Sequence, residues 1–191
     1  MKKQGYLTVL FVTEDDRSDF GAKFTAFMEH VTYPSDFRYN QIHAEIIVNN
    51  TGYSAVGRPP QHCVIKYTFD GEPEAQHYVE LVKLPVADVD LAQEVLEHMS
   101  STEATYDIPY LKFLVPSIFI KDLDLDPKHW GHLFCSQFVL LSLRKMEKMN
   151  IIQLPRSSLA YLYDCPSQTC TPARLRHLLD KILSGQKMND I

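Results

Sequence analysis

The stretch Ile42–Val48 reads Ile-His-Ala-Glu-Ile-Ile-Val and guides the interpretation of the rest of the chain. Apolar, mostly β-branched residues dominate it, which predicts a buried strand. Because successive side chains of a strand point to opposite faces of the sheet, His43 and Glu45 share one face. The stretch therefore predicts a strand that presents an imidazole beside a carboxylate.

A second stretch, Phe134-Cys135-Ser136-Gln137-Phe138-Val139, lies in a segment with a long apolar face that predicts a helix over residues 133–149. A cysteine at the start of a helix lies where backbone N–H groups and the helix dipole favour the thiolate. A thiol, an imidazole and a carboxylate can serve as nucleophile, base and orienting group. We therefore predict a thiol hydrolase or acyltransferase site made of Cys135, His43 and Glu45.

The remaining apolar patterns predict an α+β protein in which helices pack against one small antiparallel sheet. Asn49-Asn50-Thr51-Gly52 is a turn signal, so the strand after it is expected to pair back as a hairpin. We expect the strands of the middle third to form a meander, and the 191 residues to form one domain. The expected strands are 6–12, 42–48, 53–56, 62–69 and 77–84, and the expected helices are 20–31, one from 88, 133–149 and one from 172. A polar loop is expected at 121–130 and an irregular segment at 155–163, while 106–116, bracketed by Pro109 and Pro116, favours neither helix nor strand.

Composition and charge argue against several classes of protein. The net charge of −5 argues against broad nucleic-acid binding, which needs a basic face. No apolar run reaches the roughly 20 residues of a membrane span, and no secretion signal is evident at the start. The four irregularly spaced cysteines are expected to be reduced thiols in a cytoplasmic protein, with a Cys165–Cys170 disulfide as the alternative. Gly5, Gly21 and Gly52 form no phosphate-binding loop, so we expect no cofactor.

Each candidate residue also has a structural interpretation. A cysteine on an apolar helix often serves only core packing, so Cys135 can be inert. His43 can be an exposed strand residue, or one whose hydrogen bonds are satisfied without catalysis. Glu45 differs, because an ionised carboxylate in an apolar run needs solvent or a partner. The three residues together favour catalysis more than any one of them does.

A metal site is the competing interpretation of the same region. His129, His132 and Cys135 are spaced by three residues and could place ligands on adjacent helical turns, with Cys165 and Cys170 as further thiolates. Structural zinc sites have tighter cysteine spacing, so we expect no metal. The acidic run Asp122–Asp126 lacks the glycine and distal glutamate of a calcium loop and is expected to be a solvated loop.

The order of these parts resembles the circularly permuted NlpC/P60 branch of the papain-like fold. In that branch the histidine strand precedes the cysteine helix, as Ile42–Ile47 precedes Phe134–Val139 here, and residues 106–114 resemble the Tyr-Asp region before the cysteine. The resemblance covers roughly residues 7–162. It implies a permuted papain-like domain over residues 1–191 with a C-terminal helix.

The resemblance implies that Cys135 is the nucleophile, His43 the general base and acid, and Glu45 the third polar residue. Tyr39 corresponds by this similarity to an aromatic residue that lines the site and binds substrate. The substrate would be a peptide, protein or lipid-derived acyl compound, and we favour hydrolysis of an amide, isopeptide or ester bond. A catalytically silent interaction module and a lipid acyltransferase or thioesterase stay open. Gln41-Ile42-His43-Ala44 stands where many relatives have Ser-His-Val-Gly, a departure that bears mainly on substrate specificity.

Overall fold

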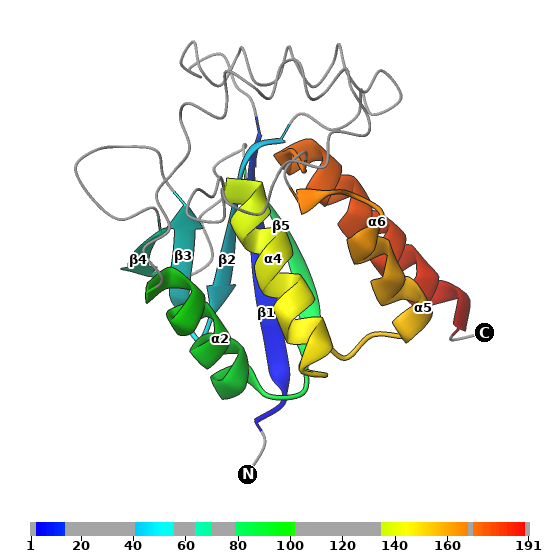
Figure 1. Cartoon of the computed structure of the whole chain (residues 1–191), viewed down its shortest axis with the longest axis horizontal. Helices are drawn as coiled ribbons and strands as arrows, with labels where there is room; N and C mark the ends of the chain where they lie inside the picture. Colours follow the sequence, from blue (N-terminus) through cyan, green and yellow to red (C-terminus); the bar gives the residue numbers. More distant parts are fainter. Residues whose placement is uncertain are drawn as a thin grey trace.

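The chain is α+β, with a five-stranded antiparallel sheet and helices packed on it (Figure 1). The computed structural model describes residues 3–13, 41–55, 64–69, 79–101, 135–167 and 170–189. Within these ranges the strands are β1 (Gly5–Thr13), β2 (Gln41–Val48), β3 (Thr51–Ala55), β4 (Val64–Thr68) and β5 (Val79–Val86). The helices are α2 (Val89–Ser101), α4 (Cys135–Lys148), α5 (Arg156–Leu159) and α6 (Pro172–Asn189), with a 3-10 turn, η3 (Ala160–Tyr163). The α+β expectation is confirmed.

The strands run in the order β4-β3-β2-β1-β5, and each neighbouring pair is antiparallel. Asn49 and Asn50 both have positive φ, 47° and 58°, and join β2 to β3 as a two-residue turn. The meander is confirmed for β2, β3 and β4. It is wrong for β5, which pairs with β1 and not with β4, so that the apolar β1 becomes an interior strand between β2 and β5.

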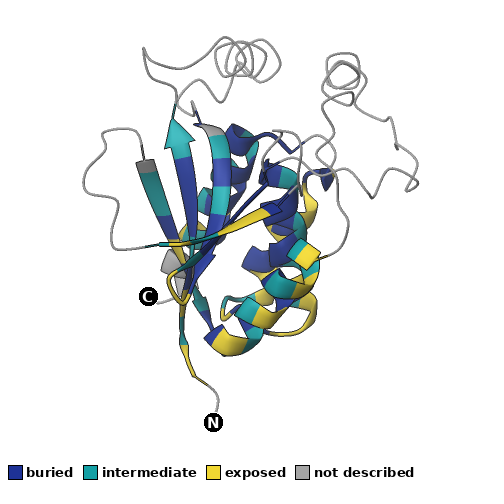
Figure 2. Cartoon of the chain, turned by 90° about the vertical axis from the view of Figure 1, so that its left-hand side faces the viewer, coloured by how far each residue is buried: buried dark blue, intermediate teal, exposed yellow. Residues whose placement is uncertain are grey.

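One face of the sheet carries the hydrophobic core. Alternation along β1 turns Leu7, Val9 and Phe11 to this face, where each is fully buried. Ala44 and Ile46 of β2 join them, because they lie opposite Phe11 and Val9 in the register. Figure 2 shows the buried residues concentrated between the sheet and the helices. His43 and Glu45, which alternate with Ala44 and Ile46, thus belong to the other side of the pleat.

The helices are fixed by local caps and by long-range hydrogen bonds. Asp88 caps α2, since its carboxylate accepts hydrogen bonds from the backbone N–H groups of Asp90 and Leu91 at 3.2 and 3.3 Å. Arg144 of α4 donates two hydrogen bonds to the Leu162 carbonyl oxygen, at 2.9 and 2.7 Å, and one to that of Cys165. These bonds attach η3 and the residues just after it to α4.

Some expectations fall outside the described residues or need correction. The helix expected at 20–31 and the segments 106–116 and 121–130 lie outside the described residues. Residues 155–163, expected to be irregular, form the helical turns α5 and η3 instead. Among the described helices, none is both long and apolar enough to cross a membrane.

Candidate active site

A bulge in β2 immediately precedes His43, whose side chain contacts the first residue of α4. Val12 of β1 pairs with His43 and Thr13 pairs with Gln41, so Ile42 is an extra residue in the ladder. Such bulges bend a strand, increase its twist and redirect side chains, and they are frequent beside active sites. Figure 1 shows the first turn of α4 next to the beginning of β2.

Cys135 is the first residue of α4 and is buried, with 5% of its surface exposed. Its sulfur interacts with the His43 side chain and with the backbone N–H groups of Ala44 and Ser136. The Ser136 hydroxyl donates a 2.5 Å hydrogen bond to the carbonyl oxygen of Cys170, which fixes this end of the helix. Backbone donors, a helix N-terminus and an imidazole therefore converge on one thiol.

The thiol and the imidazole shift each other's pKa. Burial raises the pKa of Cys135, but the positive charge of His43 and its hydrogen bond outweigh burial, so the pKa of the thiol lies below its usual value. Burial lowers the pKa of His43, but the Cys135 thiolate, and then Glu45, raise it to about 10. Each group therefore favours the charged form of the other, which corresponds to a thiolate–imidazolium pair at neutral pH.

Glu45 is the second charged partner of the His43 imidazole. Its Oε1 lies 3.0 Å from His43 Nε2, and the two side chains are 17% and 26% exposed. Ser54 Oγ of β3 also lies 3.0 Å from Nε2, and the Tyr67 hydroxyl of β4 donates to Glu45 Oε2. Burial raises the pKa of Glu45, but hydrogen bonds from His43 and Tyr67 lower it below the usual value overall.

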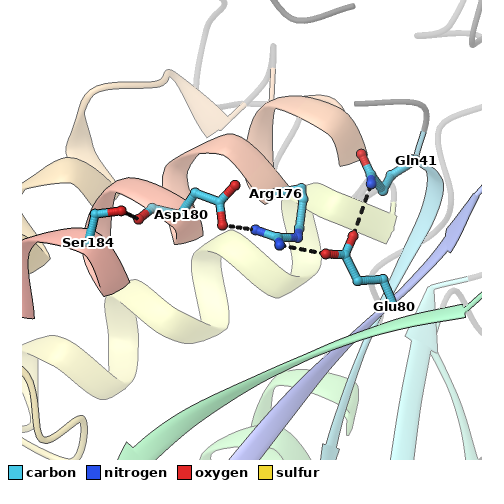
Figure 3. A network of polar contacts seen from close by, with 5 residues as sticks. All are labelled: Gln41, Glu80, Arg176, Asp180 and Ser184. Carbon is cyan, nitrogen blue, oxygen red and sulfur yellow. Dashed lines mark hydrogen bonds and ion pairs between the residues drawn. The ribbon is translucent and has the colours of Figure 1, made fainter. Parts of the chain in front are cut away.

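The beginning of β2 is tied to α6 by a separate polar network (Figure 3). Gln41, which is buried, donates a 3.1 Å hydrogen bond to Glu80 of β5. Glu80 is also paired with Arg176 of α6, and Arg176 is paired with Asp180 one turn later. This network connects the beginning of β2, two residues before His43, to β5 and α6.

The structure brings together three of the residues that the sequence indicated, Cys135, His43 and Glu45. Tyr39 lies outside the described residues, and so do His129 and His132 of the competing metal site. Within the described part of the chain, no group of three or more His, Cys, Asp or Glu side chains could hold a metal ion.

Sequence reasoning missed Ser54 and Tyr67. A signal for Ser54 was available: a two-residue turn at Asn49 and Asn50 sets Val48 opposite Thr51, and counting along the hairpin sets Glu45 opposite Ser54. Tyr67 had no comparable signal, because its position depends on the register of β4 against β3.

No known protein family, curated protein or solved structure matches the chain.

Proposed function

We propose that the chain is a thiol hydrolase of the peptidase or amidase type, with Cys135 as nucleophile, His43 as general base and acid, and Glu45 as the orienting carboxylate. The observation that carries this proposal is the position of His43, which contacts the Cys135 thiol and also hydrogen-bonds to Glu45. A nucleophile, its base and an orienting group within hydrogen-bond reach are the arrangement that covalent catalysis requires.

The proposed reaction begins with attack of the Cys135 thiolate on a carbonyl carbon. The resulting oxyanion needs backbone donors, and within the described residues the N–H of Cys135 at the start of α4 can supply one. Loss of such a donor typically slows a reaction by about 10²–10³-fold. His43 then gives its proton to the departing amine or alcohol, which leaves an acyl group on the sulfur. Water, deprotonated by His43, hydrolyses this thioester and restores the thiolate and imidazolium.

The roles of the two imidazole nitrogens follow from the contacts. Nε2 faces both Glu45 and Ser54, so Nδ1 is the nitrogen left for the thiol and the leaving group. The carboxylate thereby fixes the ring orientation and stabilises the imidazolium. A permuted papain-like fold over the whole chain agrees with this proposal, because the histidine strand β2 precedes the cysteine helix α4.

The substrate that suits this chemistry is an amide, isopeptide or ester of a peptide, a protein or a lipid-derived acyl group. All of these present a carbonyl carbon that a thiolate can attack. Hydrolysis and acyl transfer differ only in the acceptor that resolves the acyl-enzyme. Amide, ester and thioester substrates with short peptide or fatty-acyl groups, incubated with and without added amine acceptors, separate these outcomes. Cys135→Ala is the inactive control.

The first test measures the rate of iodoacetamide labelling of each cysteine across the neutral pH range, read by mass spectrometry. In the wild type, Cys135 is expected to react fastest and to keep its rate as the pH falls towards neutral, because its pKa is lowered. His43→Gln should slow Cys135 at neutral pH by about 100-fold, which corresponds to a pKa rise of about two units.

The matched control is His98→Gln, which changes a histidine in the last turn of α2. It should leave the labelling of Cys135 unchanged. Cys165 and Cys170 are internal references in every sample, since both are buried thiols. The proposal fails if wild-type Cys135 labels no faster than these two, or if its rate is unaffected in His43→Gln; a catalytically silent module is then the better interpretation.

A further inference from the structure

Tyr67 reaches the proposed site from two strands away. It lies on the edge strand β4, and β3 separates it from Glu45 on β2. Its hydroxyl nevertheless donates a hydrogen bond to Glu45 Oε2, while Glu45 Oε1 faces His43. The two carboxylate oxygens are thus held by different residues, which fixes the rotation of the carboxylate.

Gly52 of β3 makes this reach feasible. In the register, Gly52 lies opposite Tyr67 on one side and opposite Ile47 on the other. A Cβ atom at position 52 would overlap the ring and hydroxyl of Tyr67. The backbone of Gly52 is not left-handed, so space for the tyrosine ring, rather than a turn conformation, is what requires glycine here.

We infer that Tyr67 is a positioning residue of the thiol site: lying across Gly52, it holds the Glu45 carboxylate against His43 and thereby maintains the reactive Cys135–His43 pair. This inference rests on the proposed function, because it assigns Tyr67 a task only if that pair is catalytic. Tyr67 contacts the orienting carboxylate and acts on the thiol through Glu45 and His43.

The direction of the effect follows from the contacts. Without the Tyr67 hydroxyl, the charged Glu45 carboxylate loses a hydrogen-bond donor and can turn towards solvent. Its hold on His43 weakens, the pKa of His43 falls, and the pKa of Cys135 rises because the positive charge beside it is less populated. Ser54, which also contacts His43 and Glu45, remains and limits the loss.

Two other Tyr–Glu pairs supply a comparison within the same chain. Tyr53 donates to Glu97 at 2.7 Å and Tyr163 donates to Glu147 at 2.9 Å. The Tyr163 pair is exposed and links η3 to α4, away from His43. Tyr163→Phe therefore removes the same kind of hydrogen bond without touching the proposed site.

The test compares Tyr67→Phe with Tyr163→Phe by the pH midpoint of Cys135 alkylation. Tyr67→Phe is expected to move the midpoint upwards and to slow labelling at neutral pH by about 3–10-fold, corresponding to about half to one pKa unit. Tyr163→Phe should leave the midpoint in place. A merely structural role for Tyr67 predicts a loss of stability with an unchanged midpoint.

Gly52→Ala provides an independent second variant, because it displaces the Tyr67 ring without altering its hydroxyl. It should shift the midpoint in the same direction as Tyr67→Phe. In the double variant the two shifts should not add, because only one hydrogen bond can be lost. Additive shifts would contradict the inference, and if one variant does not fold, the other decides.

Failure of the inference is distinguishable from failure of the proposed function. If wild-type Cys135 is not activated by His43, the proposed function fails and Tyr67 has no site to position. If the wild type is activated but neither Tyr67→Phe nor Gly52→Ala moves the midpoint, the inference is wrong and the proposed function stands.

Discussion

Cys135 and Cys170 are both buried, with 5% and 0% of their surfaces exposed, but their thiols have different neighbours. Burial raises the pKa of Cys170, and Cys165 beside it raises it further, so that the pKa lies well above its usual value. The same burial at Cys135 is outweighed by His43. Arg174 and Arg144 lower the pKa of Cys170 without reversing the direction. A cation in direct hydrogen-bond contact, rather than a cation nearby, distinguishes the two thiols.

Unfolding should erase the difference in reactivity between Cys135 and Cys170. This comparison gives the largest expected effect. In the native protein, Cys135 should label faster than Cys170 at neutral pH by about 100-fold or more, since Cys170 is both protonated and inaccessible. In concentrated urea the two rates should converge, with Cys170 accelerating and Cys135 losing its activation. Alkylation followed by mass spectrometry in both conditions measures this. Similar native rates would mean that the two cysteines are equivalent packing residues.

Glu45→Gln tests how much of the difference in labelling rate between Cys135 and Cys170 depends on the carboxylate that is hydrogen-bonded to His43. Because Glu45 raises the pKa of His43, its neutralisation should slow Cys135 labelling at neutral pH by about 10-fold and leave Cys170 unchanged. Labelling of both cysteines in the variant and the wild type measures this. An unchanged Cys135 rate would show that His43 activates the thiol without Glu45.

The lowered pKa of Glu45 also predicts how the free energy of unfolding changes with pH. The pKa of Glu45 is lower in the folded protein than its usual value of 4.5, so the unfolded chain binds more protons as the pH falls through this region. The stabilisation from Glu45 is therefore fully present above about pH 4.5 and is lost as the pH falls below this value. Urea unfolding at neutral and acidic pH should show a smaller acid-induced loss in Glu45→Gln than in the wild type.

Much of this arrangement was accessible from the sequence because it depends on local patterns. The alternation around His43 and Glu45 predicted their shared face, and the apolar periodicity after Cys135 predicted a helix that begins near this residue. The bulge at Ile42 was not predictable, because it exists only in the pairing of β2 with β1. The contact of Tyr67 with Glu45 also depends on two strand registers and on the missing side chain of Gly52.

The prediction that β5 would continue the meander failed for a related reason. Sequence order suggested that β5 follows β4 in the sheet, and each strand by itself fits either position. The pairing is decided by β1, whose side chains are largely buried along residues 7–11 and which is hydrogen-bonded on both edges. Such a preference arises from packing between distant segments, which a local pattern does not contain.

The smallest expected effect concerns a charge pair that lacks the burial of the Cys135 site. Lys66 and Glu97 form an ion pair with side chains 51% and 40% exposed. Solvent screens such pairs, and Glu97 keeps the hydrogen bond from Tyr53, so Lys66→Met should change the free energy of unfolding by less than about 1 kcal/mol. The pH midpoint of Cys135 alkylation should stay in place, because Lys66 is absent from the contacts that shift the thiol's pKa. Urea unfolding and the alkylation profile measure both quantities, and a shifted midpoint would mean that distant surface cations, and not the His43 contact alone, distinguish Cys135 from Cys170.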